Sequence, residues 1–222
     1  MFTGIVQEIG IISNKEETES GVRLEVKVSK TFLNKLEKGA SISVNGVCLT
    51  VIEFENDIVS FDVIPETLRV TNIEFLSVDS KVNLERSLKF GDEVGGHILS
   101  GHISCRAPSK LISSDDEIEL RVKCPKEWIN YIFHNGYIAL NGASLTVANK
   151  TEDTFSVYLI PETLNATNLS DIKDGDSLNI EVDQTTYAAV KAAAVKREQK
   201  NQRKNRLGRP PRFYSIALWQ IQ

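Results

Sequence analysis

Two pairs of polar residues share one spacing and could do chemistry. Ser144 and Thr146 lie two positions apart, and Cys48 and Thr50 repeat that spacing earlier in the chain. Residues two apart on a β-strand face the same side, so each pair presents its hydroxyl or thiol groups together. Such groups can bind a polar ligand, or they can satisfy buried backbone groups. Their parallel placement in two similar segments favours ligand pockets.

His102, which follows Gly101, is a candidate acid or base because histidine titrates near neutrality. It is equally plausible as a structural hydrogen-bonding residue. A Ser-His-Asp hydrolase is possible in principle, but no Gly-x-Ser-x-Gly elbow surrounds Ser144. No pair of histidines has the spacing of metal ligands, and Gly95-Gly96 does not form a phosphate-binding loop. We therefore expect no metal site.

An internal repeat explains why the polar pairs occur twice. The segment 45–51, NGVCLTV, returns at 141–147 as NGASLTV, and the Pro-Glu-Thr-Leu at 65–68 returns at 161–164. Both copies are displaced by 96 residues, and a shared displacement indicates a duplicated folding unit. The sequence predicts two homologous domains, at 1–96 and 97–184.

Composition limits the setting of the protein. Three cysteines without close spacing argue against a disulfide framework and a zinc site, and favour a reducing, cytoplasmic location. The amino terminus does not resemble a signal peptide, and no apolar run reaches the length of a membrane span. We expect neither export nor membrane insertion.

Charge is unevenly distributed along the chain. The net charge is −4, although nine Lys or Arg and a single Glu follow from Lys191 onward. The remainder is therefore acidic, which argues against nucleic acid as the main ligand. The basic end could still bind polyanions.

Alternating apolar and charged residues predict strands at 22–28 and in the copy at 118–123. Further strands are expected at 41–44, 48–54, 58–63 and 81–85, between turn-forming residues. Short helical turns carrying Phe32, Leu33 and Leu36, and their copies Trp128, Ile129 and Ile132, would cover the barrel ends. The fold class expected is mainly β: two tandem homologous small six-stranded Greek-key-like β-barrels plus a C-terminal α-helix.

The predicted helix covers residues 185–198, is rich in alanine and lies outside the repeat. Tyr187, Val190, Ala194 and Val195 fall near one face, which favours packing on copies of itself in an oligomer; packing on its own subunit is the alternative. Residues 199–222 form an atypical basic tail, expected to be disordered, with a polyanion or partner site as the alternative.

Several motifs agree in order and spacing with one known family. The start Met1-Phe2-Thr3-Gly4-Ile5-Val6, the segment 45–50, the doubled Pro-Glu-Thr-Leu and Ser100-Gly101-His102 closely resemble the alpha-chain type of riboflavin synthase. The resemblance covers about residues 1–197.

This resemblance implies a transferase that converts two 6,7-dimethyl-8-ribityllumazine molecules into riboflavin and a 5-amino-6-ribitylamino-pyrimidinedione. No metal or redox cofactor is needed. Two equal substrates take unequal roles, which gives the duplication a chemical reason. The family assembles as a homotrimer, and the predicted helix at 185–198 matches its trimer-forming helix. The active site pairs the first barrel of one subunit with the second barrel of a neighbour, and association with lumazine synthase is a further possibility.

Site residues carried over by position fall into three sets. The catalytic and pocket-closing candidates are His102, Ser144, Thr146, Cys48, Phe2 and Asp183, with Cys48 or water as nucleophile. The first pocket would use Gly4, Ile5, Val6, Cys48, Leu49, Thr50, Asp62, Val63, Ile64, Pro65, Glu66 and Thr67. The second would use Gly101, His102, Ile103, Asn135, Ser144, Leu145, Thr146, Tyr158, Leu159, Ile160, Pro161, Glu162 and Thr163.

Two features depart from the family pattern. Asn135 stands where the family often has Lys, which could weaken substrate contact, and the tail beyond Gln199 has no recognised counterpart. The main rival is the lumazine-binding antenna protein of luminous bacteria, which keeps one working pocket, whereas both halves look intact here. A flavin reductase barrel is a third reading, but it lacks a nucleotide-binding Rossmann half.

Overall fold

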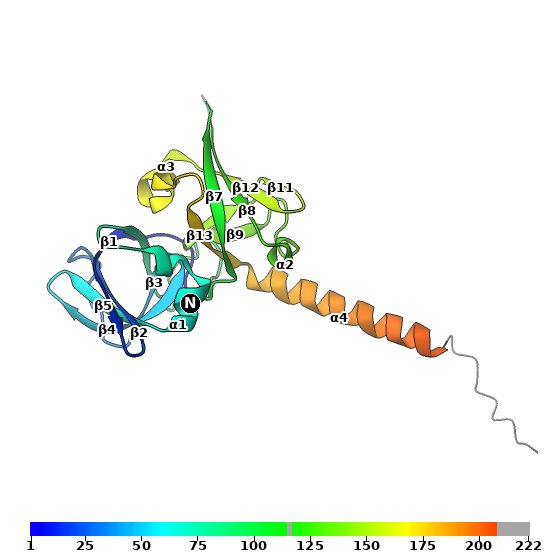
Figure 1. The fold of residues 1–222 in the computed structure, drawn as a ribbon, viewed down its shortest axis with the longest axis horizontal. Coiled ribbons are helices and arrows are strands. Elements are labelled where there is room, and N and C mark those ends of the chain that lie inside the picture. Colours follow the sequence, from blue (N-terminus) through cyan, green and yellow to red (C-terminus); the bar gives the residue numbers. More distant parts are fainter. Residues whose placement is uncertain (115–116, 208–222) are drawn as a thin grey trace, which may run out of the picture. The chain divides into compact units, whose positions relative to one another are not determined.

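The fold is given by a computed structural model that describes residues 1–114 and 117–207, with side chains to Gln202. Residues 1–184 form one compact unit, and a second unit begins at Thr185. Each unit is described by itself. Figure 1 shows the strands of the first unit gathered into two β structures, one from each half of the repeat.

The first half is a closed barrel with strand order β1-β2-β5-β4-β3-β6. Because β2 pairs with β5 rather than with β3, the order is of the Greek-key kind that the sequence predicts. The strands are β1 (Glu8–Thr18), β2 (Gly21–Lys27), β3 (Ser41–Val44), β4 (Val47–Glu55), β5 (Ile58–Val63) and β6 (Lys81–Arg86).

The repeated Asn-Gly pairs turn the chain between neighbouring strands. Asn45 and Gly46 have φ values of 48° and 83°, and Asn141 and Gly142 have 44° and 81°. Positive φ at both central residues is the geometry of the two-residue hairpin turn, for which Asn-Gly is the preferred sequence. The repeated motif therefore places Cys48 and Ser144 at equivalent positions, just after the turns.

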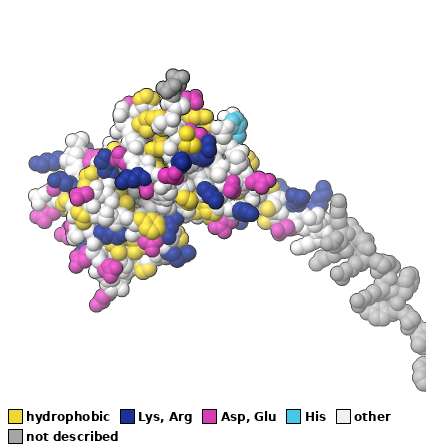
Figure 2. Space-filling model, turned by 45° about the horizontal axis from the view of Figure 1, so that its top comes forward, with side chains coloured by type: hydrophobic (Ala, Val, Ile, Leu, Met, Phe, Trp, Pro, Cys, Tyr) yellow, Lys and Arg dark blue, Asp and Glu magenta, His cyan; other side chains and the backbone are white. Residues whose placement is uncertain are grey.

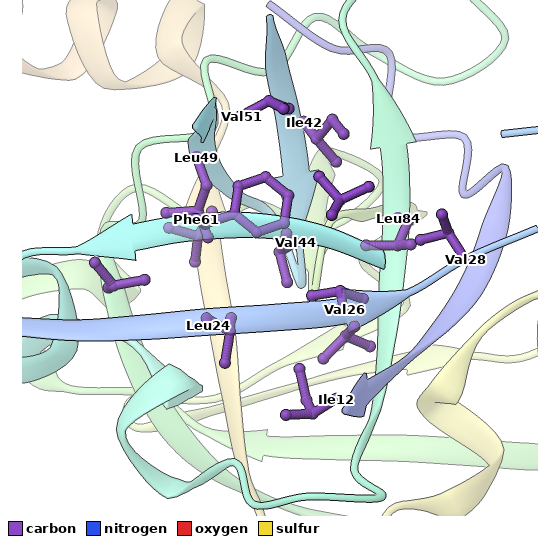
Figure 3. Packing of buried hydrophobic residues seen from close by; sticks show 14 of the residues in the cluster. Ile12, Leu24, Val26, Val28, Ile42, Val44, Leu49, Val51, Phe61 and Leu84 are labelled. Atoms are coloured by element: carbon purple, nitrogen blue, oxygen red, sulfur yellow. The ribbon is translucent and has the colours of Figure 1, made fainter. Parts of the chain in front are cut away.

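Alternate residues of the first-half strands fill the barrel. Figure 3 shows Phe61 in the barrel interior, close to Val44 and Leu49, with Leu24 and Leu84 from other strands nearby. Phe61 is 1% exposed and Leu24 is fully buried. This alternation is the period-two pattern that predicted the strands.

The second half forms a seven-stranded sheet in the order β10-β9-β13-β7-β8-β12-β11. Its strands are β7 (Cys105–Ser113), β8 (Ile118–Lys123), β9 (Tyr137–Leu140), β10 (Ala143–Thr146), β11 (Asn149–Lys150), β12 (Thr154–Tyr158) and β13 (Ser177–Val182). The copy of β4 is split into β10 and β11 between Thr146 and Asn149, at the position equivalent to the register shift between Val51 and Glu53 in β4. This interruption gives seven strands where six were expected.

Short helices follow equivalent strands in the two halves. Helices α1 (Pro65–Val70) and α3 (Pro161–Ala166) begin at the repeated prolines, which suit the first helical position. The 3-10 helices η1 (Asn72–Phe75) and η2 (Asn168–Asp171) come next.

The predicted coverings of the barrels differ between the halves. In the second half, α2 (Lys126–Ile129) is a short helix, and in the first, the equivalent segment forms hydrogen-bonded turns. Lys35 has a φ of 53°, which does not continue a helix. Phe32 and Leu36 nevertheless pack into the first-half core.

Six buried or nearly buried asparagines join the two halves. Asn179 donates to Asn45 O at 2.8 Å, and its equivalent Asn83 donates to Asn141 O at 2.9 Å. Asn72 and Asn168 donate across the same boundary, to Asn141 and Asn45. Buried amides are tolerated when their hydrogen bonds are satisfied, so this network specifies how the halves pair.

The second unit contains α4 (Gln184–Leu207). This helix is longer than expected: it was predicted to end at residue 198, but residues 199–207, which were assigned to the disordered tail, are helical. This stretch is rich in Lys, Arg and Gln, which favour helix. The rest of that predicted tail, 208–222, lies outside the described residues.

On the surface, acidic and basic side chains are interspersed with apolar ones (Figure 2). Among the residues that the structure describes, no helix has the length and apolar character needed to cross a membrane.

Candidate active site

A cavity of about 500 Å³ lies at the second-half strand β10. Ser144 and Thr146 both line it, and so does Leu145 between them. It is lined by Ile5, Gly95, Gly96, Asn135, Tyr137, Ser144, Leu145, Thr146, Val147, Ala148, Tyr158, Ile160 and Thr163. Seven of these are residues expected in the second pocket, namely Asn135, Ser144, Leu145, Thr146, Tyr158, Ile160 and Thr163.

A histidine that the sequence analysis did not select stands beside Ser144. His97 Nδ1 and Ser144 Oγ share a hydrogen bond of 2.7 Å. The His97 ring stacks on Tyr137 with centroids 5.1 Å apart. Gly96 permits this approach, because a Cβ atom there would lie 2.6 Å from Ser144 Cβ.

The electrostatic environment keeps His97 able to accept a proton. Burial lowers the pKa of His97, and the negative charge of Asp183 opposes this effect. The imidazole is therefore neutral near pH 7. Its Nε2 is buried and has no hydrogen-bond partner among the described residues. A neutral imidazole next to a hydroxyl can act as a general base.

His102, the expected acid or base, is not part of this arrangement. Its side chain is exposed and does not line the cavity. Its backbone N–H donates to Ser100 Oγ at 3.1 Å. His97, and not His102, therefore forms the hydrogen bond with Ser144. The double glycine before His97 was the available signal, since it allows close approach of another segment.

The two glycine loops cross between the halves, which reverses part of the predicted assignment. Gly4 O accepts a 2.8 Å hydrogen bond from Ser144 N, and Ile5 lines the second-half cavity. Gly101 O accepts a 2.9 Å bond from Cys48 N. Gly4 and Ile5 thus belong with the second half, and Gly101 with the first.

Ile103 follows the same crossed arrangement. It packs against the hydrophobic core of the first barrel, and its Cδ1 would lie 3.4 Å from a Cβ on Gly46. The loop that carries it therefore lies against the first half, and Ile103 does not line the second-half cavity. Val6 is half-buried.

Cys48 occupies the first-half position equivalent to Ser144 but has different surroundings. It is half-buried and packs against Phe2, Leu99 and Ala139. Phe2 is 1% exposed and forms a strand bridge with Leu99, so it is an internal packing residue. Thr50 is exposed beyond Cys48 on β4, and Leu49 faces the barrel core.

Several expected pocket side chains are engaged elsewhere. Val63 and Leu159 are 1% and 5% exposed, so their side chains fill the barrels instead of facing a ligand. Asp62 forms an ion pair with Arg23 at 3.0 Å, and Glu66 pairs with Arg69. Exposed groups at the helix starts are Ile64, Pro65, Pro161 and Glu162, and Thr67 is half-buried.

Metal-binding groups do not gather in the part of the chain that the structure describes, where no cluster of three or more His, Cys, Asp or Glu could hold an ion. Cys48, Cys105 and Cys124 are free thiols.

Two related β structures, each with a polar pair after an Asn-Gly turn, define a duplicated ligand-binding protein. The family model described as the lumazine binding domain matches the chain twice, at residues 3–87 and 100–183. Two solved structures of LumP, complexed with 6,7-dimethyl-8-(1'-D-ribityl) lumazine and with riboflavin, superpose with TM-scores of 0.75 and 0.76. They are 30% and 32% identical and cover 83% of this chain and 100% of theirs.

Relatives with higher sequence identity are riboflavin synthases. Riboflavin synthase of Escherichia coli is 43% identical over 192 residues, covering 86% of this chain and 90% of the relative. The riboflavin synthase of Chlamydia pneumoniae is 42% identical over 190 residues, covering 86% and 94%, and that of Bacillus subtilis is 36% identical, covering 82% and 85%. The chain therefore belongs to the riboflavin synthase family of lumazine-binding domain proteins.

Proposed function

We propose that this chain catalyses the riboflavin synthase reaction. It transfers a four-carbon unit between two 6,7-dimethyl-8-ribityllumazine molecules and releases riboflavin and 5-amino-6-ribitylamino-pyrimidinedione. The atoms and electrons of the products balance those of the two substrates, so the reaction requires no external oxidant.

One observation carries this proposal: the two binding units are related but chemically unequal. Cys48 N and Ser144 N make equivalent hydrogen bonds to Gly101 O and Gly4 O. Ser144 also has the His97 imidazole at 2.7 Å, whereas Cys48 packs against apolar groups. A dismutation needs such a difference, because identical substrates must become a donor and an acceptor.

The residue roles follow from these surroundings. His97 and Ser144 act as a proton-transfer pair on the lumazine in the second-half cavity, where a methyl group on the ring must lose a proton. Thr146 and Tyr137 line the same cavity and orient the substrate. Asp183 supports His97 electrostatically. Cys48 or water adds to the second lumazine, and stacking of the two rings supplies the required proximity.

Assembly as a homotrimer is part of the proposal. Helix α4 extends over 24 residues, and Val195 on it is 51% exposed. An exposed helix of this composition gains stability from packing against copies of itself. A trimer would bring the first half of one subunit to the second-half cavity of a neighbour. A cytoplasmic location, supported by the free thiols, and association with lumazine synthase are further proposals.

A non-catalytic lumazine-binding protein is the second candidate, favoured by the structural likeness to LumP. The two candidates differ in the number of working pockets. We expect two lumazines per chain for the enzyme and one for the binding protein.

The deciding experiment is incubation of the purified chain with 6,7-dimethyl-8-ribityllumazine under anaerobic conditions without added cofactor. Flavin absorbance and the mass of the pyrimidine product are followed together. One flavin formed for each pair of lumazines consumed is the expected result. Tight binding with strong lumazine fluorescence and no flavin would favour the binding protein instead.

A further inference from the structure

Two buried glutamates occupy equivalent positions in the two halves. Glu85 on β6 is 3% exposed, and Glu181 on β13 is 2% exposed. The mechanism outlined above uses neither of them. A buried carboxylate is costly unless several donors surround it, so the partners of these two residues indicate what they do.

Both carboxylates bind a glycine loop in the same way. Glu85 Oε1 accepts hydrogen bonds from Thr3 N at 2.6 Å and Thr3 Oγ1 at 2.8 Å, and Oε2 accepts one from Gly4 N at 3.0 Å. Glu181 Oε1 accepts from Ser100 N and Ser100 Oγ, each at 2.7 Å, and Oε2 accepts from Gly101 N at 3.0 Å. Each glutamate therefore fixes two successive N–H groups of one loop.

The loops that are held in this way reach into the opposite half. Glu85 belongs to the first barrel, but Gly4, which it holds, accepts the hydrogen bond from Ser144 N in the second half. Glu181 belongs to the second half, but Gly101 accepts the bond from Cys48 N in the first. Each loop packs closely on the residue that it contacts. A Cβ on Gly4 would lie 2.5 Å from Ser144 Cβ, and a Cβ on Gly101 would lie 2.5 Å from Cys48 Cβ.

Only a carboxylate satisfies all three donors of each loop. A glutamine side chain has one acceptor oxygen and one NH₂ group. Whichever way the amide is turned, its NH₂ faces a backbone N–H of the loop. The buried donor left without an acceptor then favours displacement of the loop.

We propose that Glu85 and Glu181 are crossed positioning residues. Glu85 sets the position of Ser144 and thereby the contact between Ser144 and His97, while Glu181 sets the position of Cys48. Each half of the molecule thus controls the reactive residue of the other half. The positioning of Ser144 and Cys48 is inferred from the contacts above. Only the expected effect on flavin formation rests on the proposed function.

The test compares Glu85→Gln with Glu181→Gln in the full chain, each serving as the control for the other. The first readout is the NMR signal and pKa of the His97 imidazole. The second is the alkylation rate of Cys48 by iodoacetamide, resolved from Cys105 and Cys124 by peptide mass mapping. Neither readout needs a substrate.

We expect Glu85→Gln to shift the His97 titration and to leave Cys48 alkylation unchanged. Conversely, Glu181→Gln should speed Cys48 alkylation and leave His97 unchanged. Flavin formation should fall by about 10- to 100-fold in both, as for a small misplacement of reacting groups. The proposal is overturned if each variant alters the reactive residue of its own half, or if both variants alter both readouts equally.

Milder variants cover the case in which a glutamine variant does not fold. Thr3→Val removes one hydroxyl donor, and Ser100→Ala removes one hydroxyl donor together with the acceptor of the His102 N–H. Both leave the carboxylate and its bonds to the loop N–H groups in place. The same crossed pattern is expected at smaller size, and Thr3→Ser should restore the wild-type His97 signal. Folded variants without the crossed pattern would refute the proposal. If the pattern appears but the chain makes no flavin, the proposed function fails and the positioning role stands.

Discussion

Ser144 and His97 are 47 residues apart in the chain, yet they share one hydrogen bond. This contact is the chemical difference between the halves, because Cys48 has apolar neighbours at the equivalent position. At the scale of the residue, the main question is therefore whether His97 moves a proton.

Replacing His97 by Gln should lower the rate of flavin formation by about 10²- to 10⁴-fold, the usual contribution of a general base. Lumazine binding should change much less, since glutamine keeps a polar group beside Ser144. Steady-state kinetics and fluorescence titration measure the two effects. The matched control is His102→Gln, which alters an exposed side chain and should retain most activity. An equal loss in the control would return the acid-base role to His102.

The pH dependence follows from the lowered pKa of His97. The unfolded chain protonates this residue near its ordinary pKa of about 6.5, and the folded chain does so only at lower pH. Between these values the unfolded state binds more protons, so the free energy of unfolding falls as the pH is lowered through this window. Flavin formation should fall in the same direction. Urea titrations and kcat/KM profiles between pH 5 and 8 test this, and His97→Gln should remove its part of the slope.

Elements position these residues through two tight contacts and one polar network. The contacts are the glycine loops at Gly4 and Gly101, and the network is the set of asparagines between the halves. Most other side chains at these positions would disturb the backbone geometry of the glycine loops or leave groups of the asparagine network without partners.

Gly4→Ala tests the loop crossing. Gly4 has a φ of 76°, and an added Cβ would meet Ser144. Backbone strain alone should cost about 1–3 kcal/mol, and the clash should also reduce flavin formation. Gly39→Ala is a matched control, because Gly39 has a φ of 87° with open space around its Cβ position. Thermal unfolding and activity are measured for both. Equal activity in the two variants would show that contact with Ser144 is unimportant.

Asn179→Ala tests the asparagine network. Its side chain donates to Asn45 O and to Asn72 Oδ1, both at 2.8 Å, and accepts from Asn72 N at 2.6 Å. Each buried partner left unsatisfied costs about 1–3 kcal/mol. We expect a lower urea midpoint, and less than additive loss in the double variant with Asn72→Ala. Full additivity would mean that these asparagines act independently.

On the scale of the whole molecule, the duplication supplies two related but unequal halves, and the proposed assembly uses α4. If three copies associate through the face of α4 that carries Tyr187, Val190 and Ala194, a charge placed there should separate them.

Ala194→Glu should reduce the sedimenting mass from trimer toward monomer, because a carboxylate buried between helices is unfavourable. The control Ala192→Glu places the same charge on the opposite side of the same helix and should leave the mass unchanged. Flavin formation should fall with the trimer if the site requires a neighbouring subunit. A trimer that survives both substitutions would place assembly on another surface.

Local patterns in the sequence predicted most of the fold. Strand period, Asn-Gly turns and prolines at helix starts depend on neighbouring residues, and the 96-residue repeat required that the halves share one architecture. The matching polar pairs at Cys48 and Ser144 followed from the same signals. The split of one strand into β10 and β11 did not, since the repeated segments are alike in sequence while β4 passes the equivalent position as one strand with a register shift.

The pairing of loops and reactive residues was decided by the tertiary structure. No local pattern states that Gly4 crosses to Ser144, that Gly101 crosses to Cys48, or that His97 replaces His102 as the partner of Ser144. These contacts exist because two folded halves meet through buried hydrogen bonds, and such a meeting depends on residues that are distant in the chain. The sequence alone determined that there are two related halves with matching polar pairs, and the packing of the halves determined which loop meets each pair.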